Sequence, residues 1–297
     1  MQSIQQLAII GSTASGKTSL AIKVAHKMNA HILSLDSLAI YKEIDIVSAK
    51  PTLDERENIK HFGLDFIHPN DPFDVTLFIK LYQEAYQTSL REKKNLIIVG
   101  GTSFYLKILL EGISDLPSLS SQTKAKTKIY LHDLTSAYTM LYHLDADYMS
   151  KISKNDSYRI EKVLNIYIET SLTPTQYFKQ NPPKSIITKP LPIYNIMWGR
   201  AVLRERIALR TQMMIKDGLI DEVCRLEKKY SRNLNCMKSI GIKETLAYLD
   251  GIYSKKILIE KITTNTARLA KRQVTFNNSQ FDTIHTGTLK MLEEELL

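Results

Sequence analysis

Short apolar runs alternate with helical patterns along the first third of the chain. Leu7–Ile10, His31–Leu35 and Leu96–Val99 have the length of buried strands, and helical patterns occur at Lys17–Met28 and Phe104–Leu110. Strand–loop–helix units of this size are typical of a parallel sheet flanked by helices. The pattern therefore predicts an α/β fold.

Three loops directly follow the predicted strands, at residues 11–18, 36–37 and 100–102. In parallel sheets, active sites lie where loops leave the carboxyl ends of the strands. We therefore expect these three loops to share one functional site.

The character of the sequence changes after Leu116–Pro117, where it becomes rich in Ser, Thr and Lys and then amphipathic. A further strand is predicted at Ile193–Met197, and most of the chain beyond it has helical patterns. We expect residues 1–116 and about 185–297 to form one α/β core with a helical C-terminal region. Residues from about 117 to 184 should form a small helical insertion domain.

The loop between the first strand and the first helix matches the phosphate-binding pattern GxxxxGK[ST] in full. Its residues are Gly11, Ser12, Thr13, Ala14, Ser15, Gly16, Lys17 and Thr18. The glycines let backbone amides wrap a phosphate at a helix N-terminus, the lysine adds positive charge, and the threonine can ligate Mg²⁺. The loop predicts a di- or triphosphate site in a P-loop NTPase-like sheet, and leaves open whether ATP is the ligand.

The acid that P-loop NTPases usually carry at the end of an apolar strand is missing from Leu96–Val99, which runs into Gly100-Gly101-Thr102. The well-placed strand-end carboxylate is instead Asp36. Small-molecule P-loop kinases also use an acid after the second strand, so Asp36 alone does not decide the chemistry. The alternative role is a helix N-cap, for which Asp is a favoured residue.

Charge is unevenly distributed along the chain, whose 40 Lys and Arg outnumber 31 Asp and Glu for a net charge of +9. Residues 1–116 carry 12 basic and 13 acidic side chains, whereas residues 117–276 carry 27 and 14. The simple interpretation is a lysine-rich solvated surface. The more specific one is a face that binds a polyanion, because neutralising phosphates dominates affinity for nucleic acids.

Several features argue against other classes of protein. No apolar run approaches the ~18 residues needed to span a membrane, and the N-terminus does not resemble a signal peptide. The two cysteines, Cys224 and Cys236, form no metal-binding pattern and fit a reducing cytosol. We therefore expect a cytoplasmic protein without a membrane partner.

Further short motifs occur in an order and spacing shared with a known family. They are the phosphate loop, Asp36-Ser37, Tyr41 with Asp45-Ile46, Ser48-Ala49-Lys50-Pro51, Val99-Gly100-Gly101-Thr102-Ser103-Phe104-Tyr105, Asn155-Asp156-Ser157-Tyr158-Arg159-Ile160, Ser239-Ile240-Gly241-Ile242-Lys243-Glu244 and Ala270-Lys271-Arg272-Gln273-Val274-Thr275. Over about residues 7–276, the chain resembles bacterial tRNA dimethylallyltransferases. It departs from that family's pattern at Ser12, Leu38-Ala39, Val47, Ile242 and Phe276.

The resemblance implies a reaction: transfer of a dimethylallyl group from dimethylallyl diphosphate to the exocyclic amine of adenosine 37, just 3′ of the tRNA anticodon, with release of diphosphate. It implies Mg²⁺ as the cofactor, with Thr18 as a ligand. By match, Asp36 is the general base, Thr102 lies near the reacting groups, and Arg210 binds the diphosphate. From the residues alone, Thr102 could simply cap a helix, and Arg206 with Arg210 could form an exposed basic stripe.

The resemblance also implies contacts with the tRNA anticodon stem-loop, including contacts from the insertion. By match, the contacts come from Asp36 and Ser37, from the segment Tyr158, Arg159, Ile160, Glu161 and Lys162, and from the segment Lys238, Ser239, Ile240, Gly241, Ile242 and Lys243. Leu38 and Ala39, which follow Asp36-Ser37, are included in the set, and Lys271 and Arg272 on the last long helix are candidate contacts to the tRNA backbone. An uninvolved surface role remains the alternative for individual lysines. We expect the enzyme to act as a monomer.

Three other functions are compatible with parts of the sequence. A small-molecule or nucleotide kinase would use the same phosphate loop, but does not need the strongly basic segment at residues 117–276. A non-catalytic RNA-binding switch would tolerate loss of Asp36. An enzyme that prenylates free adenosine nucleotides is the closest rival, and it too would not need the basic segment.

Overall fold

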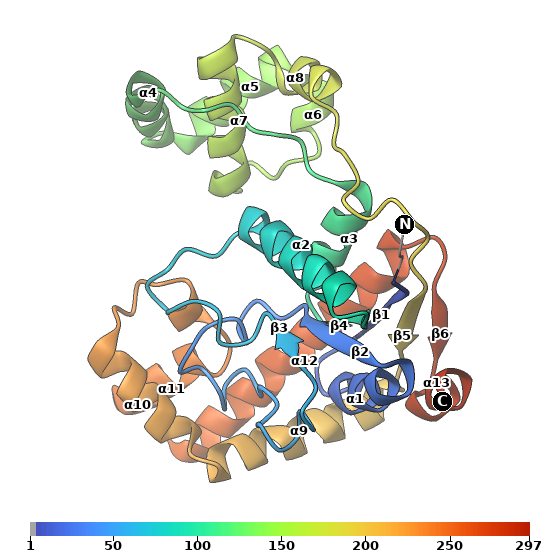
Figure 1. The fold of residues 1–297 in the computed structure, drawn as a ribbon. Coiled ribbons are helices and arrows are strands. Elements are labelled where there is room, and N and C mark those ends of the chain that lie inside the picture. The colour runs from blue at the N-terminus through green and yellow to red at the C-terminus, as the bar shows by residue number, and fades with distance from the viewer. Residues whose placement is uncertain (1–3) are drawn as a thin grey trace. The chain divides into compact units, whose positions relative to one another are not determined.

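The computed structural model describes residues 4–297 and divides into two compact units (Figure 1). The first unit combines the chain up to Leu109 with Ile187–Leu297, and the second is Leu110–Ile186. The second unit starts earlier than Pro117, where the sequence changes character. The Tyr177 hydroxyl donates a hydrogen bond to the Asp115 carbonyl at 2.9 Å, which holds this connecting stretch to the second unit.

A six-stranded sheet forms the centre of the first unit, in the order β3-β2-β4-β1-β5-β6. The strands are β1 Gln6–Gly11, β2 Ala30–Ser34, β3 His61–Phe62, β4 Asn95–Gly100, β5 Ile193–Ile196 and β6 His285–Gly287. Every neighbouring pair is parallel, so the expected parallel α/β fold is confirmed. In this register Ile10 lies beside Gly100 and Ser34 beside Val99, so the three predicted loops leave the same edge of the sheet.

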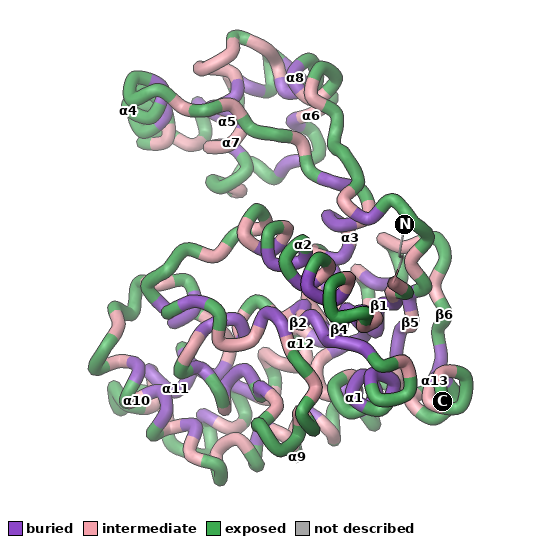
Figure 2. Tube along the Cα trace, in the orientation of Figure 1, coloured by how far each residue is buried: buried purple, intermediate pink, exposed green. Residues whose placement is uncertain are grey.

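Helices cover both faces of the sheet (Figure 1). Alternate residues of the strands, among them Ile9, Ile32 and Ile97, pack against α1 (Lys17–Met28) and α13 (Leu289–Leu296). The helices α2 (Val75–Arg91), α3 (Ser103–Glu111) and α12 (Lys255–Gln280) lie on the opposite side. The strands β1, β2 and β4 are buried by these layers (Figure 2).

The C-terminal part of the first unit is helical, as the sequence predicts. It contains α9 (Arg200–Lys216), α10 (Leu219–Lys229), the short 3₁₀ turn η1 (Cys236–Lys238) and α11 (Ile242–Leu249). The long helix α12 contacts both α9 and β1, and the Asn277 amide donates to the Asn195 side chain in β5 at 3.1 Å. The last long helix is therefore anchored to the centre of the sheet.

The second unit is a small helical domain with its own core. Its helices are α4 (Ser121–Leu131), α5 (Leu134–Leu144), α6 (Ala146–Met149), α7 (Ser157–Thr170) and α8 (Pro174–Gln180). Leu141, Met149, Ile160 and Leu164 are buried together. Across residues 4–297, the structure has no helix with the length and apolar character needed to cross a membrane.

Candidate active site

The phosphate loop follows β1 and opens α1, as expected. Gly11 and Gly16 adopt positive φ angles of 151° and 95°. A Cβ atom at Gly11 would lie 2.9 Å from the Ile196 carbonyl oxygen of the neighbouring strand. A side chain at this position would therefore disturb both the loop and its contact with β5.

Four side chains from distant parts of the chain brace this loop. The Trp198 indole donates to the Ser15 carbonyl at 2.9 Å, and Arg206 Nε donates to the Ala14 carbonyl at 2.7 Å. Arg210 Nη1 lies 3.4 Å from the Thr13 hydroxyl. Gln273 Oε1 accepts from the Thr13 amide at 2.8 Å, while its Nε2 donates to the Gly101 carbonyl at 3.0 Å.

These contacts decide between the two interpretations of Arg206 and Arg210. Both arginines reach the phosphate loop, and Arg206 also stacks over the Trp198 ring at 4.8 Å. They are therefore part of the site and not merely an exposed stripe. No role in the site was expected for Trp198 or Gln273, although Gln273 belongs to the family motif Ala270-Lys271-Arg272-Gln273-Val274-Thr275.

Two cations, Lys17 and Arg210, are concentrated beside the loop. Lys17 Nζ donates to the Ser12 carbonyl at 2.6 Å. The pKa of Lys17 is lowered to about 7, first by removal of water and then by the nearby charge of Arg210, while the attraction of Asp36 opposes both effects. Removal of water also lowers the pKa of Arg210. The arrangement stabilises an anion placed between the two groups.

Asp36 lies at the edge of the sheet directly after β2. Its Oδ1 accepts hydrogen bonds from the backbone amides of Leu38 at 2.8 Å and Ala39 at 3.2 Å. These bonds cap a turn and not a helix, because no helix follows Asp36, so the alternative of a helix N-cap is wrong. Because both amides use the same oxygen, the second carboxylate oxygen remains for a substrate, so capping and catalysis are compatible roles.

Two adjoining cavities meet at Asp36. The first, of about 150 Å³, contains Lys17 and Thr18 of the phosphate loop in its wall. The second, of about 220 Å³, has Thr102 and Ser239 in its wall. The residues that line both cavities are Thr13, Asp36, Ser48, Arg210 and Gln273. The Asp36 carboxylate thus borders both the first cavity, which could hold an anion, and the second, which we call the acceptor cavity.

The first cavity contains oxygen ligands suited to a hard cation. The Thr18 and Ser34 hydroxyls and the Asp36 carboxylate all belong to its lining. His61 Nδ1 bonds to the Ile59 carbonyl at 2.8 Å, which leaves Nε2 as a buried acceptor without a hydrogen-bond partner. In residues 4–297, no three His, Cys, Asp or Glu side chains gather as a metal-binding group.

Some of the residues expected to contact tRNA line the two cavities, and others are exposed on the surface of one unit or the other. Ser37, Leu38, Ser239, Ile240 and Gly241 line the second cavity, and Ala39 lines the first. Lys238, Lys243, Lys271 and Arg272 are exposed on the first unit. On the second unit, Tyr158 and Arg159 are exposed, Glu161 is half-buried, and Lys162 Nζ lies 5.2 Å from the centre of the Tyr158 ring.

Two residues of that set are fully buried and line neither cavity. Ile160 and Ile242 are each 0% exposed, the first in the core of the second unit and the second at the start of α11. A sequence motif contains buried residues as well as residues that contact a substrate. The order of residues in the motif does not show which are which. We therefore leave the side chains of Ile160 and Ile242 out of the binding surface.

Comparisons with known proteins identify the family of the chain. The IPP transferase family model matches residues 39–280. The tRNA dimethylallyltransferase of Sulfurovum sp. is 63% identical over 100% of this chain and 98% of its own length, and that of Sulfurimonas denitrificans is 58% identical over 98% of each.

Solved structures with a similar fold indicate the same family. The tRNA delta(2)-isopentenylpyrophosphate transferase of Staphylococcus epidermidis has a TM-score of 0.69 at 28% identity, over 99% of this chain and 97% of that one. A eukaryotic dimethylallyltransferase acting on tRNA has a TM-score of 0.80 at 27% identity, over 92% of this chain and 69% of that one. The chain belongs to the IPP transferase family.

Proposed function

We propose that this protein transfers a dimethylallyl group from dimethylallyl diphosphate to the exocyclic amine of adenosine 37 in tRNA, and releases diphosphate. The observation that carries the proposal is the position of Asp36 in the walls of both cavities, one at the phosphate loop and one at Ser239–Gly241. A carboxylate in this position can face a bound diphosphate ester on one side and an incoming base on the other. The names of the relatives support the same substrates.

The phosphate loop would hold the diphosphate of the donor. Lys17, Arg210 and the backbone amides at the start of α1 supply positive charge where negative charge develops as the carbon–oxygen bond breaks. We assign Mg²⁺ to the same site, where the Thr18 hydroxyl would be a ligand. When bound, the ion would further stabilise the departing diphosphate.

Asp36 would act on the acceptor. The exocyclic amine of adenine is a weak nucleophile, because its lone pair is delocalised into the ring. As the bond from this nitrogen to the first carbon of the donor forms, the carbon–oxygen bond to diphosphate breaks and the amine proton passes to Asp36. Thr102, in the wall of the second cavity, would help to orient the reacting groups.

The acceptor must be extruded from the anticodon loop to reach the second cavity. Extrusion costs a few kcal/mol, and contacts to the base and the backbone offset it. We propose that Ser37 and Ser239–Gly241 contact the base, and that the surrounding basic surface contacts phosphates. Residues 187–276 carry 18 basic and 8 acidic side chains, whereas residues 110–186 carry 9 and 8. The excess positive charge thus lies in the C-terminal helices of the first unit and not in the insertion.

The direct test is a transfer assay. The protein is incubated with dimethylallyl diphosphate, Mg²⁺ and tRNA that lacks the modification, and the digested nucleosides are analysed by mass spectrometry. We expect prenylated adenosine at position 37. Parallel reactions contain adenosine monophosphate in place of tRNA, or ATP in place of the donor. Modification of the free nucleotide alone, or ATP-dependent phosphorylation of a small acceptor, would contradict the proposal.

Binding of tRNA should weaken steeply as salt rises, because each neutralised phosphate releases counterions. We expect the double substitution of Lys271 and Arg272 by Glu to lower tRNA affinity and to reduce the slope of log K against log salt by about 2. Filter binding between low and physiological salt measures both quantities. The matched control reverses Lys255 and Lys256, two exposed residues at the other end of α12. Equal effects of the two pairs would assign binding to net charge and not to this surface.

A further inference from the structure

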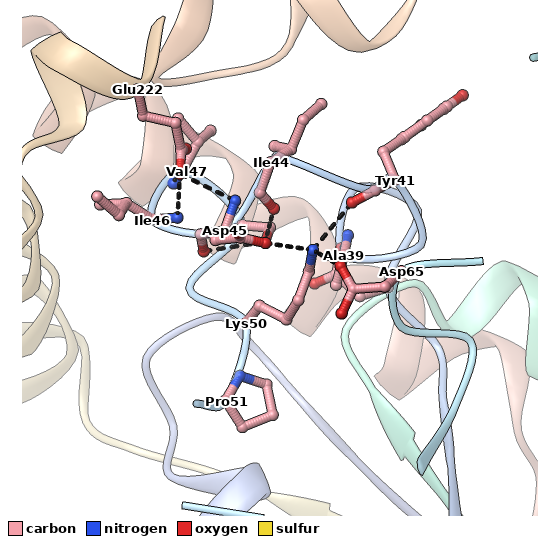
Figure 3. Close-up of polar contacts among 12 residues, drawn as sticks. Ala39, Tyr41, Ile44, Asp45, Ile46, Val47, Lys50, Pro51, Asp65 and Glu222 are labelled. Carbon is pink, nitrogen blue, oxygen red and sulfur yellow. Dashed lines mark hydrogen bonds and ion pairs between the residues drawn. The ribbon is translucent and has the colours of Figure 1, made fainter. Parts of the chain in front are cut away.

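The segment from Asp36 to Lys50 forms much of the wall of both cavities, yet it contains no helix and no regular strand. One isolated bridge, between Tyr41 and Ile67, and a few backbone hydrogen bonds connect residues 39–42 to residues 65–67, but the part from Asp45 to Val47 makes none of these bonds. Such a segment needs side chains to fix its conformation. Two buried charged residues, Glu222 and Lys50, do so (Figure 3).

Glu222 is 3% exposed and lies in the first turn of α10. Its Oε2 accepts from the amides of Asp45 at 3.0 Å and Ile46 at 2.8 Å, and its Oε1 accepts from the amide of Val47 at 3.0 Å (Figure 3). The carboxylate thus binds three consecutive N–H groups, and hydrogen bonds to an ionised acceptor are stronger than those between neutral groups. The turn at Asp45–Val47 is thereby fixed to α10.

Lys50 holds the same turn from the other side. Its Nζ donates to the Tyr41 carbonyl at 2.9 Å and to the carboxylates of Asp45 and Asp65 at 2.6 Å each. Its side chain is 3% exposed, so these bonds replace the water that the ammonium group would otherwise bind. Asp45 joins the two anchors, because its amide binds Glu222 and its carboxylate binds Lys50 (Figure 3).

The fixed turn continues directly into the acceptor cavity. Val47 and Ser48 line that cavity together with Ser37, Leu38 and Asp36. Gly241, on the other wall, makes room for Val47: a Cβ atom there would lie 3.1 Å from a Val47 methyl group. The position of the Asp45–Val47 turn therefore determines the shape of the space into which the base would enter.

We propose that Glu222 is a positioning residue for the transfer reaction, which fixes the Val47–Ser48 wall so that the acceptor amine is held against Asp36. This inference rests on the proposed function. Glu222 itself touches neither substrate and acts through the backbone of Asp45–Val47. Misplacement of a reacting group by about 1 Å can lower a rate by ~10²-fold, so the acceptor step is where loss of this anchor should appear.

The test is Glu222→Gln, which keeps the size of the side chain but turns one acceptor into a donor that faces a backbone N–H. We expect kcat for tRNA prenylation to fall by about 10²-fold. KM for tRNA should change less than threefold, because phosphate contacts elsewhere dominate its affinity. Affinity for the donor should fall much less than kcat, because Glu222 makes no contact with the phosphate loop and only Ser48 of the wall that it fixes also lines the first cavity.

The matched control is Glu43→Gln. Glu43 ties the same segment to the other end of α10 through Lys229 and Tyr230, each at 2.7 Å, but it is exposed and lies outside both cavities. We expect kcat of this variant to equal that of the wild type. Asp45→Asn is a second variant that weakens the bond to Lys50 without burying a new group. It should lower kcat several-fold, again with a smaller effect on donor affinity.

The outcomes separate this inference from the proposed function. A wild-type protein that forms no prenylated adenosine contradicts the proposed function. An active wild type with a normal kcat in Glu222→Gln overturns the positioning role, as does a parallel loss of donor affinity and kcat, which would indicate general damage. If Glu222→Gln fails to fold, a wild-type kcat in Asp45→Asn overturns the inference instead.

Discussion

Replacement of Asp36 by Asn is expected to lower the rate constant of a single transfer turnover by about 10²–10⁴-fold, the usual contribution of a general base. The amide oxygen of Asn can still accept from the Leu38 and Ala39 amides, which bind one oxygen of Asp36 in the present structure. The turn should therefore persist while the group that takes the proton is lost. The measurement is rapid-quench transfer at saturating tRNA and donor, with a separate titration of tRNA binding.

The control for this change is Asp74→Asn, at the N-cap of α2. Asp74 accepts from the Leu77 amide at 2.9 Å and lies outside both cavities, and Asn caps helices about as well as Asp. Its turnover rate should match that of the wild type. A near-normal rate in Asp36→Asn would leave Asp36 as a cap alone. A loss of tRNA binding as large as the loss of rate would make it chiefly a recognition residue.

Replacement of Lys17 by Met is expected to weaken binding of the donor by roughly ten- to a hundredfold. Hydrogen bonds to charged groups are worth about 1.5–3 kcal/mol, and 1.4 kcal/mol corresponds to a factor of about ten. Calorimetric titration with dimethylallyl diphosphate measures the loss. Lys27→Met, an exposed lysine at the far end of α1, is the control and should bind normally. Unchanged affinity in Lys17→Met would remove this lysine from the diphosphate site.

The same titration should show that the protein takes up a proton when the donor binds. Without an anion the pKa of Lys17 is lowered to about 7, so at pH 8 the amine is mostly neutral. A bound diphosphate favours the ammonium form and raises this pKa, so binding at pH 8 should take up close to one proton. Donor affinity should therefore fall as pH rises above about 7. Titrations in buffers of different ionisation enthalpy give the proton count, and the difference between wild type and Lys17→Met removes the contribution of the diphosphate itself.

The parts of the site that sequence reasoning could predict are those encoded locally. A strand, a glycine-containing loop and a helix N-terminus follow one another within residues 6–28, so the pattern gives both the loop and its place at the edge of the sheet. Asp36 could be placed there for the same reason, because parallel strands end at a common edge. The family match also assigned Arg210 to the diphosphate. In the structure Arg210 Nη1 lies 3.4 Å from the Thr13 hydroxyl of the phosphate loop, and its contact with a diphosphate stays a prediction.

The bracing of the site could not be predicted in this way. Trp198 and Gln273 reach the phosphate loop across 183 and 260 positions of sequence. Glu222 reaches the Asp45–Val47 turn across 175–177 positions. Hydrophobic periodicity indicates which face of a helix is buried, but not which polar group of a distant segment will meet it. Glu222 shares the buried face of α10 with Leu219, Val223 and Leu226. A carboxylate on an apolar face is unusual, but its role is apparent only once its partners are known.

The bond between Thr13 and Gln273 also constrains how the protein is made. Translation releases the phosphate loop within the first part of the chain, but β5, which pairs with β1, begins at Ile193, and the side chain that holds the Thr13 amide is supplied by α12. A growing polypeptide on the ribosome carries the complete loop sequence long before it carries the groups that shape it. The contact that holds the Thr13 amide therefore awaits the synthesis of α12, and a truncated translation product that stops short of this helix has the motif without this brace.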